Sequence, residues 1–202
     1  MTAHRDLLLK PMFTLETERL ILRDWKRPDW KEVQAYATDP EVYKHMIWGP
    51  NSEAQTKEFI ETAIDISYVK PRRGYELAIV WKETDSIIGG FGLQVMGKEN
   101  ANAMIGYVLH REYWGRGVVT EAAKGMMVFG FTRLNLHRMY ATCDTENVGS
   151  YRVMEKIGMR REGHFKQDTF IKGRWRDTYL YAILEREWRV LRDEAGTRGG
   201  AD

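Results

Sequence analysis

The segment YWGRGVVTEA, from Tyr113 to Ala122, combines residue types that can bind an anion. Gly115 and Gly117 flank Arg116 directly before a run of helix-forming residues. The first N–H groups of a helix have no partner within it and lie at the positive end of its dipole. Glycines lack a Cβ, so a phosphate group could approach those N–H groups closely, and Arg116 could add a charge-assisted contact at the rim. Taken alone, the two glycines fit a tight strand-to-helix turn equally well.

Two well-known phosphate loops do not match this segment. A P-loop needs four residues after its first glycine and then Gly-Lys-Ser/Thr, and a dinucleotide fingerprint needs a third glycine three residues further on. After Gly117 the chain continues with Val118, Val119 and Thr120. A phosphate group bound here would therefore belong to another kind of ligand or another fold.

The composition of the 202-residue chain favours a globular protein in a reducing compartment. Hydrophobic residues make up 43% of the chain, too many for a disordered protein. The net charge of +2 gives no concentrated basic face for nucleic acid. No apolar run reaches the ~20 residues of a membrane helix, the start MTAHRDLLLKPMF has no signal-peptide core, and Cys143 is the sole cysteine. We therefore expect a cytoplasmic protein without nucleic-acid or membrane partners.

Hydrophobic periodicity predicts one mixed α/β domain built on a central sheet. Short polar turns between three successive strands predict an antiparallel meander. A last hairpin should turn at Lys172–Gly173, followed by one or two helical turns. The expected strands are 15–25, 75–82, 86–96, 101–110 and 137–144, and the expected helices are two short ones within 28–46, a longer one from Ser52, and those at 118–133 and 147–158.

Several ordered motifs resemble the GNAT N-acetyltransferase superfamily, and most of all its RimJ/RimL-like branch, named for ribosomal-protein N-terminal acetyltransferases. They are LETERLILR, DPEV, IGYVLHREYWGRGVVTEA, LHRMYATCDTENVGSYRVMEKIGMRREG and GRWRDTYLYAIL. The resemblance runs from about Leu15 to Trp188. It implies an α/β fold with a mixed, mostly antiparallel sheet splayed in the middle and flanked by helices. We expect an N-terminal extension (1–14), the acetyltransferase domain (15–190) and a frayed C-terminal tail (191–202).

The resemblance also implies where acetyl-CoA would bind. In the family, the strand that corresponds to MIGYVLH separates from its neighbour YATC, and the pantetheine arm lies in the gap. Backbone groups around Val108 and Leu109 would pair with that arm. The loop from Trp114 to Val118 would hold the diphosphate, with Gly115, Arg116 and Gly117 at its centre. Asn147 matches the asparagine that contacts the arm, and it could equally be, or also be, the N-cap of a helix.

Two positions depart from the family's usual proton-transfer residues. A glutamate that often acts as general base is replaced by Met104, and a tyrosine that often acts as acid is replaced by Met154. Neither methionine can move a proton. Ser150 matches a serine of this branch and could donate to the departing thiolate as well as contact the cofactor. A hydroxyl bonded to the backbone in the first helical turn would explain Ser150 equally well.

Acidic residues near the predicted strands are the remaining candidates for a base. Glu76 and Glu99 are the nearest ones in the sequence, and a solvated surface carboxylate is the competing interpretation for each. Asp177 matches an acidic residue typical of the branch. We expect it instead to form a salt bridge with Arg174 or Arg176.

The lack of the usual base favours an amine of low pKa as the acceptor. An α-amino group with a pKa of about 8 is about one-tenth neutral at pH 7, whereas a lysine with a pKa of about 10.4 is neutral only about four times in ten thousand. A protein or peptide N-terminus is therefore the predicted acceptor. The alternatives are a small-molecule amine, such as an antibiotic or polyamine, and a catalytically weakened protein that senses acetyl-CoA.

The remaining predictions concern the acceptor wall, metals and assembly. Trp48 and Tyr36, in the helical segments before the meander, are predicted to line the acceptor cleft, with core packing as the competing interpretation. The histidines lack the spacing of a metal site, so we expect none and assign His45 a surface or capping role. Exposed strand edges leave a homodimer open.

Overall fold

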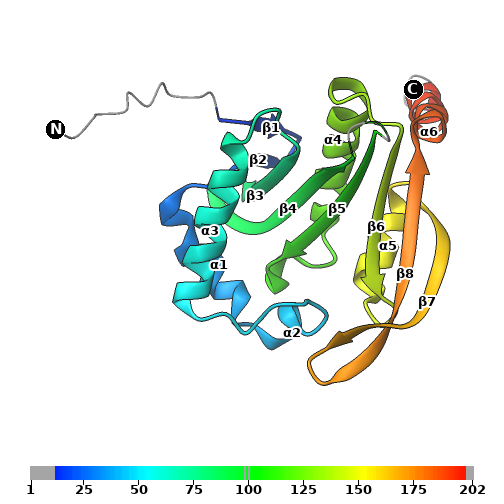
Figure 1. Cartoon of the computed structure of the whole chain (residues 1–202). Helices are drawn as coiled ribbons and strands as arrows, with labels where there is room; N and C mark the ends of the chain where they lie inside the picture. Colours follow the sequence, from blue (N-terminus) through cyan, green and yellow to red (C-terminus); the bar gives the residue numbers. More distant parts are fainter. Residues whose placement is uncertain (1–11, 98, 100, 199–202) are drawn as a thin grey trace.

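The computed structural model describes residues 12–97, 99 and 101–198, and these build one eight-stranded sheet flanked by helices (Figure 1). The strands lie in the order β1-β2-β3-β4-β5-β6-β8-β7, and β5–β6 is the one parallel pair among them. The predicted fold class is confirmed. In the described part of the chain, no helix is long and apolar enough to cross a bilayer. The elements are β1 (Thr14–Glu16), β2 (Leu20–Asp24), α1 (Trp30–Ala37), α2 (Pro40–Tyr43), α3 (Glu53–Tyr68), β3 (Gly74–Trp81), β4 (Ser86–Met96), β5 (Asn102–Leu109), α4 (Val118–Arg133), β6 (Arg138–Asp144), α5 (Val148–Lys156), β7 (Arg160–Ile171), β8 (Arg174–Leu184) and α6 (Glu185–Arg198).

Local sequence signals fix most of the boundaries. Ser52 caps α3 by accepting a hydrogen bond from the N–H of Gln55, and the Gln55 side chain accepts one from the N–H of Ser52. Gly158 ends α5 in the left-handed region, with a φ of +87°. Lys172 and Gly173 both have positive φ at the tip of the β7–β8 hairpin, as a tight hairpin turn requires. These three predictions are confirmed.

Successive side chains along each strand point to opposite faces of the sheet, and this creates two apolar cores, one on each face. On β3, Leu77 and Ile79 belong to the core under α4 and α5. Their neighbours Ala78 and Val80 belong to the core under α1, α2 and α3. Figure 1 shows α1 and α3 on one side of the sheet and α4 and α5 on the other. Strands β3 and β4 are therefore buried on both faces, because both cores include residues of these two strands.

The parallel strands β5 and β6 pair over only three residues. Asn102–Met104 align with Arg138–Tyr140, and beyond that point the pairing stops. The strands then diverge toward the lower end of the sheet (Figure 1). On its other side β5 stays paired with β4 along its whole length, from Met96↔Asn102 to Gly89↔Leu109. One edge of β5 is therefore left open from Ile105 onward, as the predicted splay requires.

Two predictions about the chain ends need correction. The single strand predicted for residues 15–25 is two strands, because the N–H of Thr17 bonds to the carbonyl of Leu20 and turns the chain. The last helix, α6, continues to Arg198 instead of stopping after one or two turns. Trp188 anchors it by packing against Phe131, with 5.1 Å between ring centroids. Residues 1–11 of the predicted extension and 199–202 of the predicted tail lie outside the described residues.

We predict that Gly89→Ala destabilises the protein whereas Gly106→Ala does not. A Cβ on Gly89 would collide with the carbonyl oxygen of Val108 and lie 3.1 Å from the Cα of Leu109, but a Cβ on Gly106 would meet nothing within 4 Å. Forcing β4 from β5 should cost about 1–3 kcal/mol of unfolding free energy, while the control should stay within about 0.5 kcal/mol of wild type. Urea denaturation measures both, and equal midpoints would contradict the predicted close approach.

Candidate active site

The glycine loop opens α4 with its backbone in the left-handed region. Gly115 and Gly117 both have a φ of +74°, and Gly117 is the N-cap of the helix. A side chain would be strained at either position. Trp114 fixes the start of the loop, because its Nε1 donates to the carbonyl oxygen of Leu109 at 2.8 Å. The loop thus points the unpaired N–H groups of the first turn of α4 away from the helix.

A cavity of about 470 Å³, here called the loop-side cavity, lies against this loop. Its lining includes all the residues predicted to bind the cofactor except Arg116. These are Val108, Leu109, Trp114, Gly115, Gly117, Val118, Asn147 and Ser150. The structure therefore brings together two segments, 108–118 and 147–150, that the sequence separates by about thirty residues.

Arg116 does not line the loop-side cavity, and its predicted contact with a phosphate at the rim stays a prediction. Its guanidinium lies over the ring of Tyr113, 5.4 Å from the centroid. Its carbonyl oxygen accepts a hydrogen bond from Nη1 of Arg19 at 3.1 Å. In this structure Arg116 shapes the loop through its backbone.

The open edge of β5 presents backbone groups to the gap at alternate residues. The N–H of His110 bonds to the carbonyl of Ile88, so the even-numbered residues at this end of β5 face β4. The backbone groups of Leu109 face away from β4, because its carbonyl oxygen accepts a hydrogen bond from Nε1 of Trp114. By the same alternation the N–H groups of Tyr107 and Leu109 face the gap. Val108 contributes its side chain to the lining, while its backbone faces β4.

Asn147 and Ser150 hold the start of α5 on the far side of the gap. The Asn147 side chain accepts a hydrogen bond from the N–H of Ser150 at 3.1 Å, so the helix-cap interpretation is confirmed. Its contact with a cofactor stays a prediction. The cap uses the N–H of Ser150 and not its hydroxyl, and Ser150 lines the loop-side cavity.

Tyr107 faces Ser150 across the gap, and the sequence analysis did not select it. Its hydroxyl donates to the carbonyl of Ser150 at 2.9 Å and lies 3.1 Å from Ser150 Oγ. A carbonyl oxygen can only accept, so the Tyr107 proton is used there and Ser150 Oγ keeps its own proton to donate. Burial raises the pKa of Tyr107 well above its ordinary value, although the hydrogen bond with Ser150 opposes this. Tyr107 therefore stays protonated and positions Ser150.

Cys143 also lies in this region, on β6. Burial raises the pKa of its thiol to about 11, and a hydrogen bond with Ser150 only partly offsets that effect. A neutral, buried thiol is a poor nucleophile. Cys143 therefore has a packing role in the wall of the cavity that it lines.

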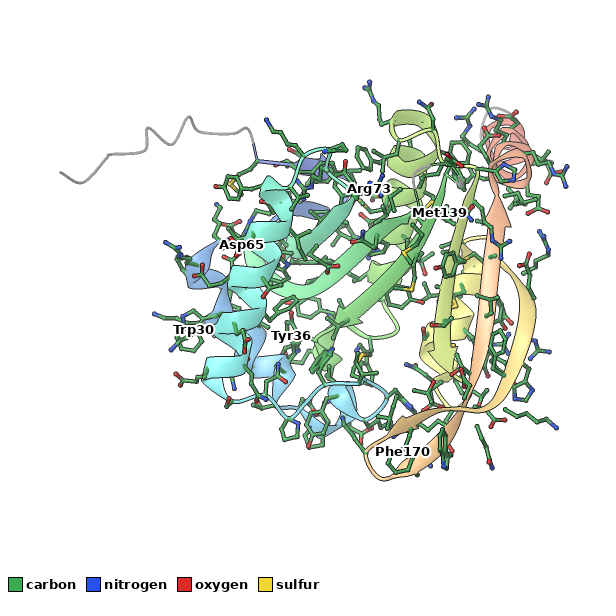
Figure 2. All side chains as sticks on the ribbon, in the orientation of Figure 1. Trp30, Tyr36, Asp65, Arg73, Met139 and Phe170 are labelled. Carbon is green, nitrogen blue, oxygen red and sulfur yellow. The ribbon has the colours of Figure 1, made fainter. Side chains whose placement is uncertain are left out.

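A larger cavity, of about 950 Å³, lies on the other side of Tyr107 and Val108. Both cavities share His45, Met46, Tyr107 and Val108 in their linings, so they meet at the splay. Tyr36 and Trp48 line the larger cavity, as does Glu76. Tyr36 is 2% exposed; it lies on α1 beside the sheet, while Phe170 marks the far tip of the β7–β8 hairpin (Figure 2).

Glu76 is the candidate base that the structure puts in a cavity. It lies on β3 opposite Gly92, where a Cβ would come within 3.0 Å of both its carboxylate oxygens. Burial raises the pKa of Glu76 above its ordinary value. Glu99 is exposed and lines neither cavity. Of the two departures from the family pattern, Met104 lines the larger cavity and Met154 is 1% exposed in the core.

The predicted salt bridge of Asp177 with Arg174 or Arg176 is wrong. Asp177 bonds to His164 at 2.7 Å instead, while Arg174 pairs with Glu146 and Arg176 with Asp144. The reason is that successive side chains of β8 point to opposite faces of the sheet. Arg176 points inward, so its neighbour Asp177 points outward.

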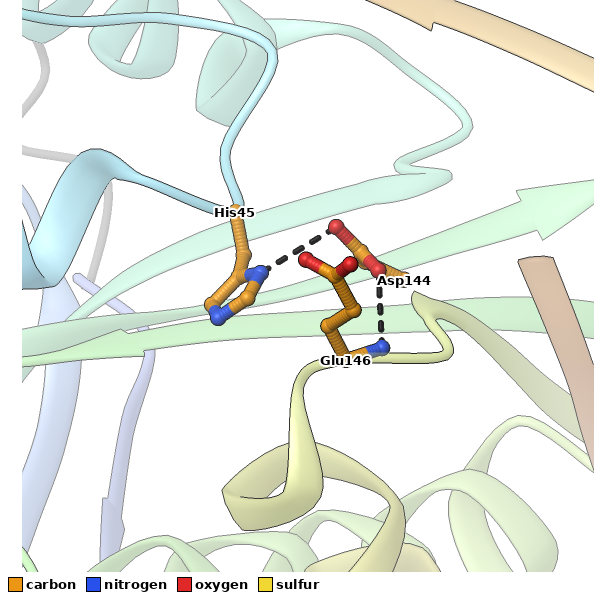
Figure 3. Close-up of side chains that lie close together, drawn as sticks. All are labelled: His45, Asp144 and Glu146. Atoms are coloured by element: carbon orange, nitrogen blue, oxygen red, sulfur yellow. Dashed lines mark hydrogen bonds and ion pairs between the residues drawn. The ribbon is translucent and has the colours of Figure 1, made fainter. Parts of the chain in front are cut away.

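An ion network lies where the two cavities meet, and Figure 3 shows three of its residues, His45, Asp144 and Glu146. Asp144, at the end of β6, accepts a hydrogen bond from Nδ1 of His45 at 3.1 Å and another from the N–H of Glu146 at 2.8 Å. Arg176 pairs with the same carboxylate and donates to the carbonyl of Lys44 at 2.9 Å. Burial acts to raise the pKa of Asp144, but these contacts outweigh it and lower that pKa. The surface or capping role predicted for His45 is therefore wrong, since its side chain is only 13% exposed and bonds to Asp144 on β6.

Three ligand atoms in this network, from His45, Asp144 and Glu146, lie within 4.8 Å of one another. A cation here would compete with the Arg176 guanidinium for Asp144. The prediction that the protein binds no metal stays a prediction.

Comparison with known proteins identifies the family. The sequence model for the Acetyltransferase (GNAT) domain matches residues 19–160. The chain belongs to the GNAT acetyltransferases. It is 37% identical over 174 residues to the uncharacterized N-acetyltransferase YnaD of Bacillus subtilis, covering 86% of this chain and 98% of that protein. The GNAT chain is thus an acetyl-CoA-dependent N-acetyltransferase.

Solved structures agree with this assignment. A GNAT-family acetyltransferase from Bacillus anthracis superposes with a TM-score of 0.76 at 33% identity, covering 86% of this chain and 99% of that one. RimL, a ribosomal L7/L12 α-N-protein acetyltransferase in complex with coenzyme A, has a TM-score of 0.76 at 18% identity, covering 85% and 98% of the two chains. The second likeness shows a shared fold. The GNAT fold of this chain is one that binds CoA.

We predict that Arg176→Met destabilises the GNAT domain strongly, because it leaves the buried Asp144 carboxylate without its guanidinium. Breaking a buried pair from one side costs about 3–5 kcal/mol. The double variant Asp144→Asn/Arg176→Met should recover part of that loss. The matched control is Arg174→Met, two residues earlier on β8. It breaks the exposed pair with Glu146 and should change the urea midpoint little. Equal midpoint shifts for Arg174→Met and Arg176→Met would contradict this prediction.

Proposed function

We propose that this N-acetyltransferase acetylates the α-amine of a protein or peptide N-terminus. The observation that carries the proposal is the charge balance of the larger cavity. Three acidic residues line it, but Asp144 is neutralised by Arg176 and Asp168 is exposed on β7, which leaves Glu76 as the buried carboxylate that faces an incoming amine. A polyamine or aminoglycoside carries several positive charges, and burying them needs several carboxylates. One free buried carboxylate suits a single amine.

The rest of the cavity supports an acceptor with apolar parts. Aromatic side chains from four separate segments before β3 line it, namely Trp25, Tyr36, Trp48 and Phe59. The β7–β8 hairpin contributes Phe165. Such a wall can hold the side chains of the first residues of a peptide. Trp48 and Tyr36 are the acceptor-binding residues in this proposal.

Glu76 is the proposed general base. Attack by the amine nitrogen on the thioester carbonyl forms the C–N bond, and the nitrogen then loses a proton that Glu76 accepts directly or through water. A carboxylate whose pKa is raised toward the working pH is a better base than an exposed one. An α-amine, about one-tenth neutral at pH 7, needs only this modest help.

Ser150 is the proposed general acid. As the C–S bond breaks, its hydroxyl donates a hydrogen bond or proton to the departing sulfur. Tyr107 leaves Ser150 Oγ with a proton to give, because the Tyr107 proton is already bound to the Ser150 carbonyl. The N–H groups of Tyr107 and Leu109 face the gap, where they would pair with the cofactor arm and hold the thioester near Ser150.

The test is thiol release from acetyl-CoA by wild type, Glu76→Gln and Glu99→Gln between pH 6.5 and 9.5. Acceptors would be a peptide with a free N-terminus, an N-terminally blocked peptide containing lysine, spermidine and an aminoglycoside. We expect the free N-terminus to give the highest kcat/KM, Glu76→Gln to lower it by about 100-fold or more, and Glu99→Gln to leave it unchanged. Below neutral pH the wild-type kcat/KM should fall with the ionisations of both the amine and Glu76, and the variant's with the amine alone.

Three results would contradict the proposal. A preference for the lysine side chain or for a polycation would overturn the acceptor. Equal activity of wild type and Glu76→Gln would overturn the base. Tight CoA binding without turnover on any acceptor would instead favour a protein that senses acetyl-CoA.

A further inference from the structure

The turn between β1 and β2 is bonded to the first turn of α4, about a hundred residues later in the chain. Glu121 is the centre of these contacts. Its carboxylate accepts hydrogen bonds from Oγ1 of Thr17 at 2.6 Å, from the backbone N–H of Arg19 at 2.8 Å and from Nε of Arg19 at 2.7 Å. These three hydrogen bonds to one carboxylate fix the position of the β1–β2 turn relative to the start of α4.

Arg19 extends the same connection to the glycine loop. Its Nη1 donates to the carbonyl oxygen of Arg116 at 3.1 Å, and its Nη2 lies 3.8 Å from where a Cβ on Gly117 would stand. The guanidinium also lies over the ring of Trp81, 5.5 Å from the centroid. One side chain therefore contacts both the loop and the helix turn that follows it, while the ring of Trp81 limits its movement.

The charges in this cluster matter for a ligand with phosphates. Glu121 lies in the first turn of α4, at the helix end that favours anions. Burial acts to raise the pKa of Glu121, but the bonds from Thr17 and Arg19 outweigh it and lower that pKa, so the group is ionised at neutral pH. An ionised carboxylate without a partner here would repel a diphosphate bound at the same helix end. Arg19 supplies the compensating charge.

We infer that Arg19 is a positioning residue for the diphosphate of acetyl-CoA. It holds the backbone of 115–117 in its anion-binding shape and neutralises Glu121, although it does not line the loop-side cavity itself. The inference rests on the proposed binding of the diphosphate by this loop. It predicts that Arg19 matters only for donors that carry the diphosphate.

The experiment compares acetyl-CoA with S-acetylpantetheine, a donor that ends before the diphosphate, in wild type and Arg19→Met. For acetyl-CoA we expect KM to rise by about tenfold in the variant with kcat within about twofold of wild type, because only binding of the remote group is weakened. For S-acetylpantetheine both constants should stay within about twofold. Calorimetric titration with CoA should give a matching loss of affinity.

Two further variants separate this role from a general effect on folding. Arg23→Met removes an arginine from β2 that is more buried than Arg19, with a side chain 17% against 38% exposed, and that pairs with Asp29. It should not change the ratio of the two KM values. Arg19→Lys keeps the charge but cannot reach both partners, and it should show the same donor-selective change with a smaller size. It also provides a readout should Arg19→Met fail to fold.

The outcomes distinguish the role of Arg19 from the role of the glycine loop. If wild type itself binds CoA no better than pantetheine, the loop is not the diphosphate site and the underlying proposal fails. If wild type does discriminate but the Arg19 variants change neither KM, or change both donors equally, the role of Arg19 is overturned while the loop assignment stands.

Discussion

Strands β5 and β6 pair over three residues and then separate, and this early end of pairing determines how the rest of the site is built. Beyond Met104 one edge of a central strand has backbone N–H and C=O groups without a neighbouring strand. Such groups are costly to bury unless something bonds to them. The protein itself uses one of them, since Leu109 O accepts from Trp114. The remaining groups form an edge suited to an extended, amide-containing chain, which describes the pantetheine arm.

Holding the sheet open requires a connection elsewhere between its two halves. The α2–α3 loop provides it, because His45 and the Lys44 carbonyl contact the Asp144–Arg176 pair on β6 and β8. At the hairpin tip Lys172 donates to the carbonyls of Tyr43 at 2.6 Å and Trp48 at 2.9 Å. These contacts join segments that no strand pairing connects. Of these residues His45 lines both cavities, so a residue that connects the two halves of the sheet also lies where the cavities meet.

The sequence predicted the parts of this structure that depend on local signals. The glycine loop, the α4 boundaries and the Lys172–Gly173 turn follow from glycine conformation and helix capping, and the family resemblance supplied the splay. The ion network could not be predicted, because His45, Asp144 and Arg176 come from three distant segments and only the folded sheet brings them together. Asp177 was misassigned because its side-chain direction depends on the register of β8. Tyr107 lies within the motif IGYVLHREYWGRGVVTEA, but its role depends on Ser150, which lies across the gap between β5 and α5.

Amide hydrogen exchange at Tyr107, Val108 and Leu109, followed residue by residue by NMR with and without CoA, tests the central claim most directly. The account predicts that CoA slows exchange at Tyr107 and Leu109, whose N–H groups face the gap, and leaves Val108 unchanged because β4 already protects it. CoA binding without added protection at Tyr107 and Leu109 would contradict the claim that the open edge of β5 holds the cofactor arm.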